Sequence, residues 1–257
     1  MNNSSQSNIH SSAKIHESAK IGPFVTIEQN VEIGAGSVIE SHAFIGKNTK
    51  LGKGNYIGPF TSLGGASQSK YDNFDDESGL EVGDNNKFHE YCCINRGSLT
   101  SNQVTKIGDN NVFMAFTHVG HDCVIGNNSV MVNQATLAGH VIIGNNVTLG
   151  YSVAVRQFCQ VGDGAFVSEC ATVVKDIMPF VIVRGAPTRV VGINKVGLER
   201  LQVPEPEMAL IKECFRAVFR RNLLVEEAVK HIETLADSTR KATILDFLAG
   251  SNRGIVR

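Results

Sequence analysis

Branched aliphatic and other apolar residues recur at every sixth position over most of this chain. The first series runs without a gap from Ile9 to Leu63, and a second runs from Ile107 to Val173. A period of six fits neither the 3.6-residue period of a helix nor the simple alternation of a strand. It is an internal repeat, and hexapeptide repeats are typical of a parallel β-helix. The pattern therefore predicts a mainly β domain built from many short strands.

Each hexad is expected to form one short strand and one corner, with its aliphatic side chain pointing inward. Three hexads then make a coil of about eighteen residues, and coils stack at about the 4.8 Å spacing of strands. Glycine often follows the aliphatic residue, as in Ile21-Gly22, and asparagine recurs at corners such as Asn127-Asn128. Both residue types tolerate the positive φ angles that corners require. Since no hexad buries its own aliphatic side chain, stability should come from neighbouring coils.

The series is interrupted twice. Nineteen residues, one more than three hexads, separate Leu63 from Val82, and the segment 64–76 is polar and begins with glycine. A second shift separates Ile94 from Ile107. We expect an inserted loop near 64–81, because functional residues concentrate in the loops of a rigid scaffold. A tolerated insertion without function is the alternative.

The hexad pattern fades after Val173, and a helical pattern follows Gly192. Residues 205–221 carry apolar side chains on one face and have prolines at their start, and residues 224–236 and 243–248 are expected to form two further helices. The sequence thus predicts a β-helix domain over residues 1–190 and a C-terminal helical domain over residues 191–257. Such a domain would cover the otherwise open edge of the last coil.

Composition narrows the class of protein. The 257 residues carry a formal net charge of -1 and are 42% hydrophobic, which suffices for about ten coils and a small second domain. The balanced charge argues against nucleic acid as a partner. Neither a signal peptide nor a long apolar run is evident, so we expect a cytoplasmic protein without an integral membrane segment.

The six cysteines lack the spacing of a zinc or redox motif. We expect them to be reduced and to act as small apolar residues. Cys123 and Cys159 lie two coils apart and should stack in register.

Candidate chemistry concentrates in residues 116–123, which contain two histidines and an aspartate. Moving one coil along the chain places His121 beside Gly139 and Asp122 beside His140. A histidine next to a carboxylate is held in one tautomer and is a natural general base. The backbone N–H of Gly139 could stabilise an oxyanion. His118 should join this patch across two stacked coils.

Two other interpretations of the patch remain. Three histidines and one aspartate could bind zinc, but flat coil faces spread side chains apart, so no metal is expected. The histidines could also be ordinary solvated surface residues. The eighteen-residue spacing argues against this interpretation, because it brings them together with Asp122 and Gly139.

The chain resembles the acyl-ACP:UDP-N-acetylglucosamine O-acyltransferases over essentially its whole length. The residues that carry the resemblance are the hexad coil, Lys70-Tyr71, the run 118–123, the steps 137–140 and 157–159, and the helical tail. The resemblance implies a left-handed β-helix fold and a location in the cytoplasm of a Gram-negative bacterium. It also implies a homotrimer with active sites between its subunits. It also implies transfer of a (3-hydroxy)acyl chain from acyl carrier protein to the 3-hydroxyl of UDP-N-acetylglucosamine, the first step of lipid A biosynthesis. No metal or redox cofactor is implied, because the donor carries the phosphopantetheine.

The resemblance also implies roles for individual residues. His121 would be the general base, Asp122 would orient it and balance its charge, and the Gly139 N–H would stabilise the oxyanion. The residues implied to contact substrate are Lys70, Asn95, His118, His140, Arg156, Gln157, Asn194 and Arg200.

A basic stripe on the first C-terminal helix suggests a docking surface for the acidic carrier protein. Lys212, Arg216 and Arg220 repeat at every fourth position, with Arg221 beside them. Such charges favour electrostatic steering. An ordinary solvated helix face is the alternative.

Several positions depart from the family pattern. Asn95 and Arg156 stand where a histidine is usual, and Val196 and Leu201 replace polar residues near the nucleotide. Two other functions therefore stay open: N-acylation of a 3-amino UDP-sugar, and a scaffold without catalysis. The His121–Asp122 pair argues against the scaffold.

Glu169 stands where the family sets acyl-chain length, often with a glycine. It lies eight hexads beyond His121 and hence on a different face of the coil. It could meet the His121 groove only across a subunit boundary, where it would favour a shorter acyl chain.

Overall fold

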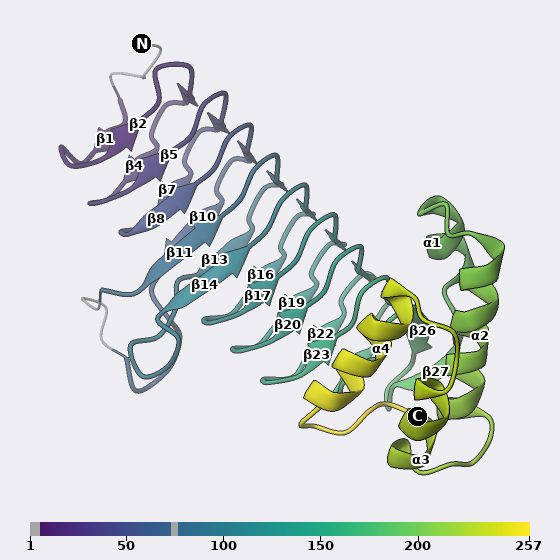
Figure 1. The fold of residues 1–257 in the computed structure, drawn as a ribbon. Coiled ribbons are helices and arrows are strands. Elements are labelled where there is room, and N and C mark those ends of the chain that lie inside the picture. The colour runs from purple at the N-terminus through teal and green to yellow at the C-terminus, as the bar shows by residue number, and fades with distance from the viewer. Residues whose placement is uncertain (1–5, 73–76) are drawn as a thin grey trace.

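In the computed structural model, residues 6–72 and 77–257 are described, and they form a long coil of short strands followed by helices (Figure 1). The strands belong to three sheets of nine, eight and ten strands among the described residues. Every pair is parallel except β26 with β27. The predicted fold class, a parallel β-helix with a helical C-terminus, is confirmed.

Each sheet takes one strand from each coil up to β24, and β25, β26 and β27 complete the first and third sheets. The first sheet contains β1 (Asn8–Ile9), β4 (Thr26–Ile27), β7 (Phe44–Ile45), β10 (Ser62–Gly65), β13 (Cys93–Asn95), β16 (His118–Val119), β19 (Thr136–Leu137), β22 (Ala154–Val155) and β25 (Thr172–Val173). The second contains β2 (Lys14–Ile15), β5 (Glu32–Ile33), β8 (Thr49–Leu51), β11 (Gly79–Val82), β14 (Val104–Ile107), β17 (Val124–Ile125), β20 (Ile142–Ile143) and β23 (Gln160–Val161). The third contains β3 (Lys20–Ile21), β6 (Val38–Ile39), β9 (Tyr56–Ile57), β12 (Lys87–Phe88), β15 (Val112–Phe113), β18 (Val130–Met131), β21 (Thr148–Leu149), β24 (Phe166–Val167), β26 (Val181–Arg184) and β27 (Arg189–Ile193).

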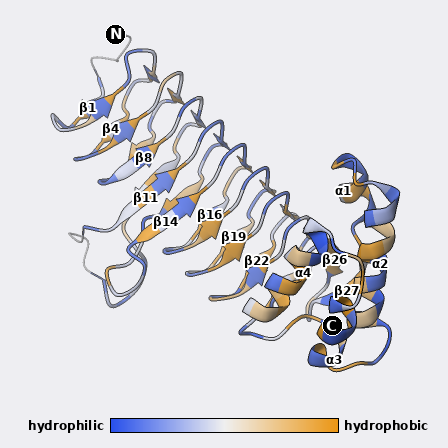
Figure 2. Ribbon diagram, in the orientation of Figure 1, coloured by the Kyte–Doolittle hydropathy of each residue, from blue (hydrophilic) through white to orange (hydrophobic). Residues whose placement is uncertain are grey.

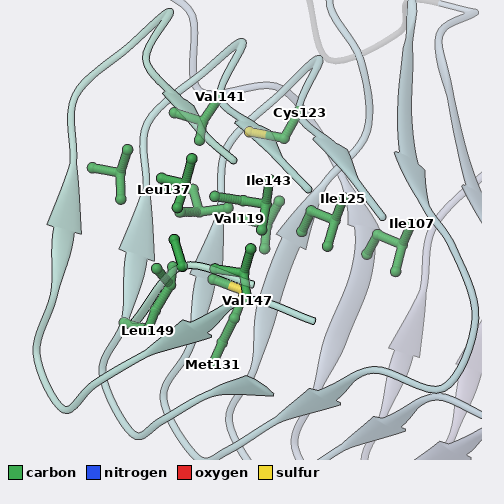
Figure 3. Packing of buried hydrophobic residues seen from close by; sticks show 14 of the residues in the cluster. Ile107, Val119, Cys123, Ile125, Met131, Leu137, Val141, Ile143, Val147 and Leu149 are labelled. Atoms are coloured by element: carbon green, nitrogen blue, oxygen red, sulfur yellow. The ribbon is translucent and has the colours of Figure 1, made fainter. Parts of the chain in front are cut away.

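The register between coils follows the eighteen-residue spacing of three hexads. His118 pairs with Thr136, and Thr136 pairs with Ala154. The aliphatic residue of each hexad points inward, so Val119, Leu137 and Ile143 are buried in one continuous core (Figure 3). In Figure 2 the hydrophobic colour recurs along the strands from coil to coil. Cys123 and Cys159 occupy equivalent buried positions, and all six cysteines are free, as expected, although Cys170 is exposed and not packed in the core.

Large aromatic side chains fill the middle of this core. Phe88 and Phe113 are fully buried in neighbouring coils, and their rings stack with centroids 4.6 Å apart. A second stack lies outside the coil at the corners after the third sheet. There Phe60, Tyr91 and Phe116 stack in sequence although each side chain is about half exposed.

Polar side chains hold the corners together. Asn55, Asn86 and Asn111 stack inside the coil, where the Asn55 and Asn86 Oδ1 atoms accept from both the backbone and the side-chain nitrogen of the next asparagine. These three residues are almost fully buried. A buried polar group is tolerated when it is hydrogen-bonded, so the ladder fixes the register without opening the core.

The two interruptions leave the coil at the same corner. β10 ends at Gly65 and β11 begins at Gly79, so the first loop spans residues 66–78, shorter at both ends than predicted because its flanks pair as strands. Residues 73–76 of the predicted insertion lie outside the described residues. The second loop spans residues 96–103 between β13 and β14. Both connect the first sheet to the second.

Helices cover the C-terminal end of the coil (Figure 1). They are α1 (Lys195–Arg200), α2 (Glu205–Phe219), α3 (Val225–Glu233) and α4 (Thr239–Gly250). The sequence predicted α2 and α3 closely, predicted only the centre of α4, and missed α1, which has six residues. No helix among the described residues combines the length and apolarity needed to cross a membrane.

Asp176 fastens the chain's last residues to the coil. Its carboxylate is buried and accepts from the Gln160 backbone, the Ser251 hydroxyl and the Arg253 backbone. Arg253 in turn lies over the Phe158 ring, 5.4 Å from its centroid.

Candidate active site

His121 and Asp122 form the turn between β16 and β17, at the corner where the first sheet passes to the second. Asp122 has a φ of 59°, and its backbone N–H donates to the Thr105 hydroxyl at 2.9 Å. Positive φ is uncommon outside glycine, although Asp tolerates it better than most residues. This turn directs the Asp122 side chain inward, where it is fully buried. We call residues 120–122 and 138–140 the His121 corner.

The two side chains form a close pair. His121 Nδ1 lies 2.7 Å from Asp122 Oδ2. An ionised carboxylate only accepts hydrogen bonds, so His121 Nδ1–H donates and Nε2 keeps its lone pair. The His121 side chain is 16% exposed. The geometry thus leaves one basic nitrogen within reach of a bound molecule.

Gly139 lies directly against that nitrogen. A Cβ built at residue 139 would lie 2.6 Å from His121 Nε2, and one built at residue 120 would lie 2.8 Å from the Gly139 nitrogen. Only glycine fits both places without moving the histidine or the backbone. Among the described residues, no acceptor pairs with the Gly139 N–H. A base and an unused backbone donor therefore stand side by side.

His140 completes the corner one coil further along. Its Nε2 lies 3.8 Å from Asp122 Oδ2, its ring meets the His121 ring edge-on at 5.1 Å, and it stacks on Phe158 at 4.6 Å. The structure thus brings together four of the five residues placed in one patch by the sequence. The fifth, His118, lies in β16 and is half-buried beside Cys93, with which it pairs in the sheet.

The metal interpretation can be compared with this geometry. His121, Asp122 and His140 offer ligand atoms that all lie within 4.8 Å of one another. However, His121 Nδ1 and Asp122 Oδ2 are hydrogen-bonded to each other. That arrangement favours a histidine–carboxylate pair over a ligand set for zinc.

The cysteines of this region are not activated. Burial raises the pKa of the Cys123 thiol to about 12, with Asp122 adding to the effect, and burial also raises the pKa of Cys92 to about 12. Nucleophilic cysteines need the thiolate. Cys123 therefore contributes to packing, and its sulfur donates to the Ala138 carbonyl.

The 96–103 loop supplies contacts that sequence reasoning missed. The Ser98 backbone N–H donates to Asp122 Oδ2 at 3.1 Å, and the Ser101 hydroxyl lies 3.3 Å from His140 Nδ1. The hydroxyl-rich run Ser98-Leu99-Thr100-Ser101 is the one sequence signal of this arrangement. Asp122 Oδ1 has no hydrogen-bond partner among the described residues.

Two further predicted substrate contacts, Lys70 and Asn95, lie earlier in the chain than the His121 corner. Lys70 lies in the 66–78 loop with Nζ over the Tyr71 ring. Asn95 ends β13 and is buried, and its Nδ2 donates to the Ala66 carbonyl while Oδ1 has no partner in the described part of the chain. Both side chains belong to the coils that precede His121.

The remaining predicted contacts lie on the C-terminal side. Arg156 is exposed and Gln157 is half-buried at the corner one coil beyond Gly139. Arg200 is exposed at the end of α1. Asn194 differs, because its Oδ1 caps α1 by accepting from Gly197 N–H and its Nδ2 donates to Gly164. The two positions that depart from the family near the nucleotide, Val196 and Leu201, are exposed.

The basic stripe on α2 is partly neutralised within the chain. Lys212 lies 3.6 Å from Glu205, and Glu213 pairs with both Arg216 and Arg221. The His231 hydrogen bond and the two arginines hold the pKa of Glu213 below its ordinary value. Arg220 ends the helix with its guanidinium over the Phe215 ring.

We expect the protein to lose stability in mild acid. Burial lowers the pKa of His118, and it also lowers that of His140 despite the opposing effect of Asp122. The unfolded chain then binds more protons than the folded chain between the lowered pKa values and the ordinary value of about 6.5. Stability should be level above that value and fall as the pH drops below it.

Thermal unfolding followed by circular dichroism between about pH 7.5 and 5.5 tests this expectation. A His118→Asn variant should lose less of its Tm over that range than the natural protein. An equal loss would mean that His118 does not carry the effect. His16→Asn, at an exposed corner, is the matched control.

Comparison with known proteins agrees with this geometry. Residues 176–256 match the family described as Udp N-acetylglucosamine O-acyltransferase, domain 2, and residues 12–47 and 105–139 match bacterial transferase hexapeptide repeats. An acyl-[acyl-carrier-protein]–UDP-N-acetylglucosamine O-acyltransferase from Anaeromyxobacter sp. (strain K) is 37% identical over 183 residues, which are 71% of each chain. One from Thiobacillus denitrificans is 37% identical over 77% of each chain.

Solved structures agree over the whole length. A UDP-N-acetylglucosamine O-acyltransferase from Moraxella catarrhalis covers 100% of both chains with a TM-score of 0.96 and 36% identity. The UDP-N-acetylglucosamine acyltransferase of Francisella novicida covers 98% of this chain and 93% of its own, with a TM-score of 0.96 and 38% identity. The coil is the left-handed β-helix of these structures. The chain therefore belongs to the family of acyl-[acyl-carrier-protein]–UDP-N-acetylglucosamine O-acyltransferases.

Proposed function

We propose that this protein transfers a (3-hydroxy)acyl chain from acyl carrier protein to the 3-hydroxyl of UDP-N-acetylglucosamine, the first step of lipid A biosynthesis. The names of its relatives support the substrates. One observation supports the chemistry above all: the bond to Asp122 leaves His121 Nε2 as an acceptor, directly against Gly139.

In the proposed reaction His121 is the general base. Nε2 takes the proton of the sugar 3-hydroxyl as that oxygen attacks the thioester carbonyl carbon. The carbonyl oxygen then becomes an oxyanion, to which the Gly139 N–H donates. When the C–S bond breaks, the departing thiolate of phosphopantetheine receives the proton from His121. Buried Asp122 favours the protonated histidine throughout.

We propose that the other site residues hold the two substrates. Lys70, Asn95, His118 and His140 would contact the sugar or its phosphates. Arg156, Gln157, Asn194 and Arg200 would lie toward the nucleotide. The internal bonds of Asn194 suggest that it acts mainly by placing α1, and hence Arg200, at the end of the coil.

We also propose a cytoplasmic homotrimer whose active sites lie between subunits and need no metal. The placement of the predicted residues supports a shared site. His121 follows β16 of the first sheet, whereas Glu169 follows β24 of the third sheet. One subunit cannot bring these two corners together, but the facing corners of two subunits can.

The carrier protein would dock on α2. Lys212, Arg216 and Arg220 supply positive charge there, and Arg220 and Arg216 are exposed. Glu205 and Glu213 reduce the positive potential of the stripe. It would therefore affect the association rate of the carrier protein and the salt dependence of that rate more than the affinity of the complex.

Transfer from a set of 3-hydroxyacyl carrier proteins to UDP-N-acetylglucosamine tests the proposal. We expect formation of the 3-O-acyl product and release of the free carrier thiol in equal amounts. A parallel reaction offers the 3-amino UDP-sugar. Transfer to the amine alone would replace the proposal by the N-acyltransferase function, and transfer to neither would favour a scaffold.

Glu169 is expected to shorten the preferred acyl chain. In the proposed trimer its exposed side chain would reach into the neighbouring subunit's groove. Each methylene that loses burial forfeits about 0.8 kcal/mol, roughly a fourfold preference. Glu169→Gly should therefore move the preferred donor by at least about two carbons toward longer chains.

The same set of donors measures this change. Glu169→Gln keeps the size of the side chain and should keep the preference if volume is the cause. A natural enzyme that already prefers chains of about fourteen carbons or more would contradict the idea, because no methylene would then have been displaced.

A further inference from the structure

Ser98, in the 96–103 loop, contacts both the His121 corner and the 66–78 loop. It is 1% exposed. Its backbone N–H donates to Asp122 Oδ2 at 3.1 Å, and its hydroxyl lies 2.8 Å from Asp72 Oδ1. One residue thus contacts both the carboxylate that holds His121 and a carboxylate of the 66–78 loop.

The direction of the hydroxyl bond follows from its partners. Ser98 Oγ also lies 2.8 Å from the Thr100 hydroxyl and accepts from the Thr100 backbone N–H. A carboxylate has no proton to give, so the Ser98 hydroxyl donates to Asp72 and the Thr100 hydroxyl donates to Ser98. Removal of the Ser98 hydroxyl therefore abolishes the bond to Asp72 together with the two bonds from Thr100.

Asp72 lies two residues after Lys70. The Asp72 backbone N–H donates to the Ser69 carbonyl, so residues 69–72 form one turn with Lys70 inside it. Asp72 Oδ2 is buried and has no partner in the described part of the chain. Among the described residues, the Ser98 hydroxyl is therefore the hydrogen-bond donor to the side chain of Asp72, and through the turn it sets where Lys70 lies.

We propose that Ser98 is a positioning residue that ties the lysine-bearing loop to the His121–Asp122 pair. Its two contacts have separate effects. The backbone N–H holds Asp122, and the hydroxyl holds Asp72 and hence Lys70. The proposal rests on the proposed function only in taking Lys70 as a substrate contact. The connection between the two loops stands on the hydrogen bonds alone.

Ser98→Ala separates these effects, because it removes the hydroxyl and keeps the backbone donor. We expect the KM for the UDP-sugar to rise about three- to tenfold, the range for losing one ordinary intramolecular hydrogen bond, while kcat changes less than about twofold. A purely structural role would instead lower the Tm and reduce the amount of active enzyme, without a selective change in KM.

Two further variants make the test specific. Asp72→Ala removes the acceptor, and the double variant with Ser98→Ala should raise KM no further than either single change. Thr100→Ala removes a hydroxyl from the same cluster but leaves the Asp72 bond, and it should leave KM unchanged. Additive effects of Ser98→Ala and Asp72→Ala would overturn the proposal.

Limited trypsin digestion gives a readout that does not depend on acyl transfer. Tyr71 is 74% exposed, and trypsin cleaves after Lys70. Cleavage at this bond should be about three- to tenfold faster in Ser98→Ala and Asp72→Ala than in the natural protein or in Thr100→Ala. Equal cleavage rates in all four proteins would overturn the proposal. If the protein transfers no acyl group, the proposed function fails while this experiment still decides whether Ser98 ties the loops.

Discussion

Replacing His121 by alanine is expected to lower the rate of acyl transfer by about 10²–10⁴-fold, the usual contribution of a general base. The ring is partly exposed and lies at a corner outside the apolar core, so its loss should leave the coil folded. Asp122 would keep the Ser98 N–H as a donor to its buried carboxylate. The loss should appear in kcat and in kcat/KM alike, because the proton moves only in the transition state.

Acyl transfer with saturating carrier protein and UDP-sugar measures this change, and circular dichroism reports the fold. His16→Ala is the matched control, since His16 is also a corner histidine but has no carboxylate partner among the described residues. It should transfer at the natural rate. A His121→Ala enzyme that keeps more than about a tenth of the natural kcat would exclude His121 as the base.

The largest effect on stability is expected for Phe113→Ala, at about 3–5 kcal/mol. Phe113 is fully buried in the middle of the coil and stacks on Phe88 at 4.6 Å. Its neighbours above and below are fixed by the backbone pairing of β12 and β18 with β15. The surrounding coils therefore cannot collapse into the cavity, and the full loss of packing should remain.

Denaturant unfolding at fixed protein concentration measures this loss. Phe116→Ala is the matched control: Phe116 lies three residues further along the same coil and also stacks on an aromatic ring, but it is 55% exposed. Its removal should have an effect below about 1 kcal/mol. Comparable losses for the two variants would show that the outer stack contributes as much to stability as the core does.

The hexad pattern predicted the coil and two juxtapositions in the site, His121 with Gly139 and Asp122 with His140, because all of them depend on a fixed period. Every inward position repeats the same environment, so one rule describes the whole core. The same rule places His121 against Gly139 without any knowledge of side-chain conformations. α1 escaped prediction because six residues show less than two turns of helical period.

The contacts of Ser98 could not be predicted for a different reason. Its bond to Asp122 uses the backbone N–H, which every residue except proline possesses. Its position depends on a loop that has left the period. Asn194 shows the converse, since its side chain is occupied by capping α1. Likewise, the sequence does not show that Arg221 pairs with Glu213, eight residues before it, in the folded structure.

The eighteen-residue pairing between coils also limits how such a chain can change length in evolution. One residue added within a strand would turn every later inward side chain outward, as in any register slip of a sheet. Removal of a whole coil would instead return each side chain to a partner of the same orientation. Insertions or deletions of less than a whole coil are harmless only in loops that lie outside the coil, such as residues 66–78 and 96–103. Both exits lie at the corner that carries His121, so tolerated changes of length would fall where they alter what the enzyme binds.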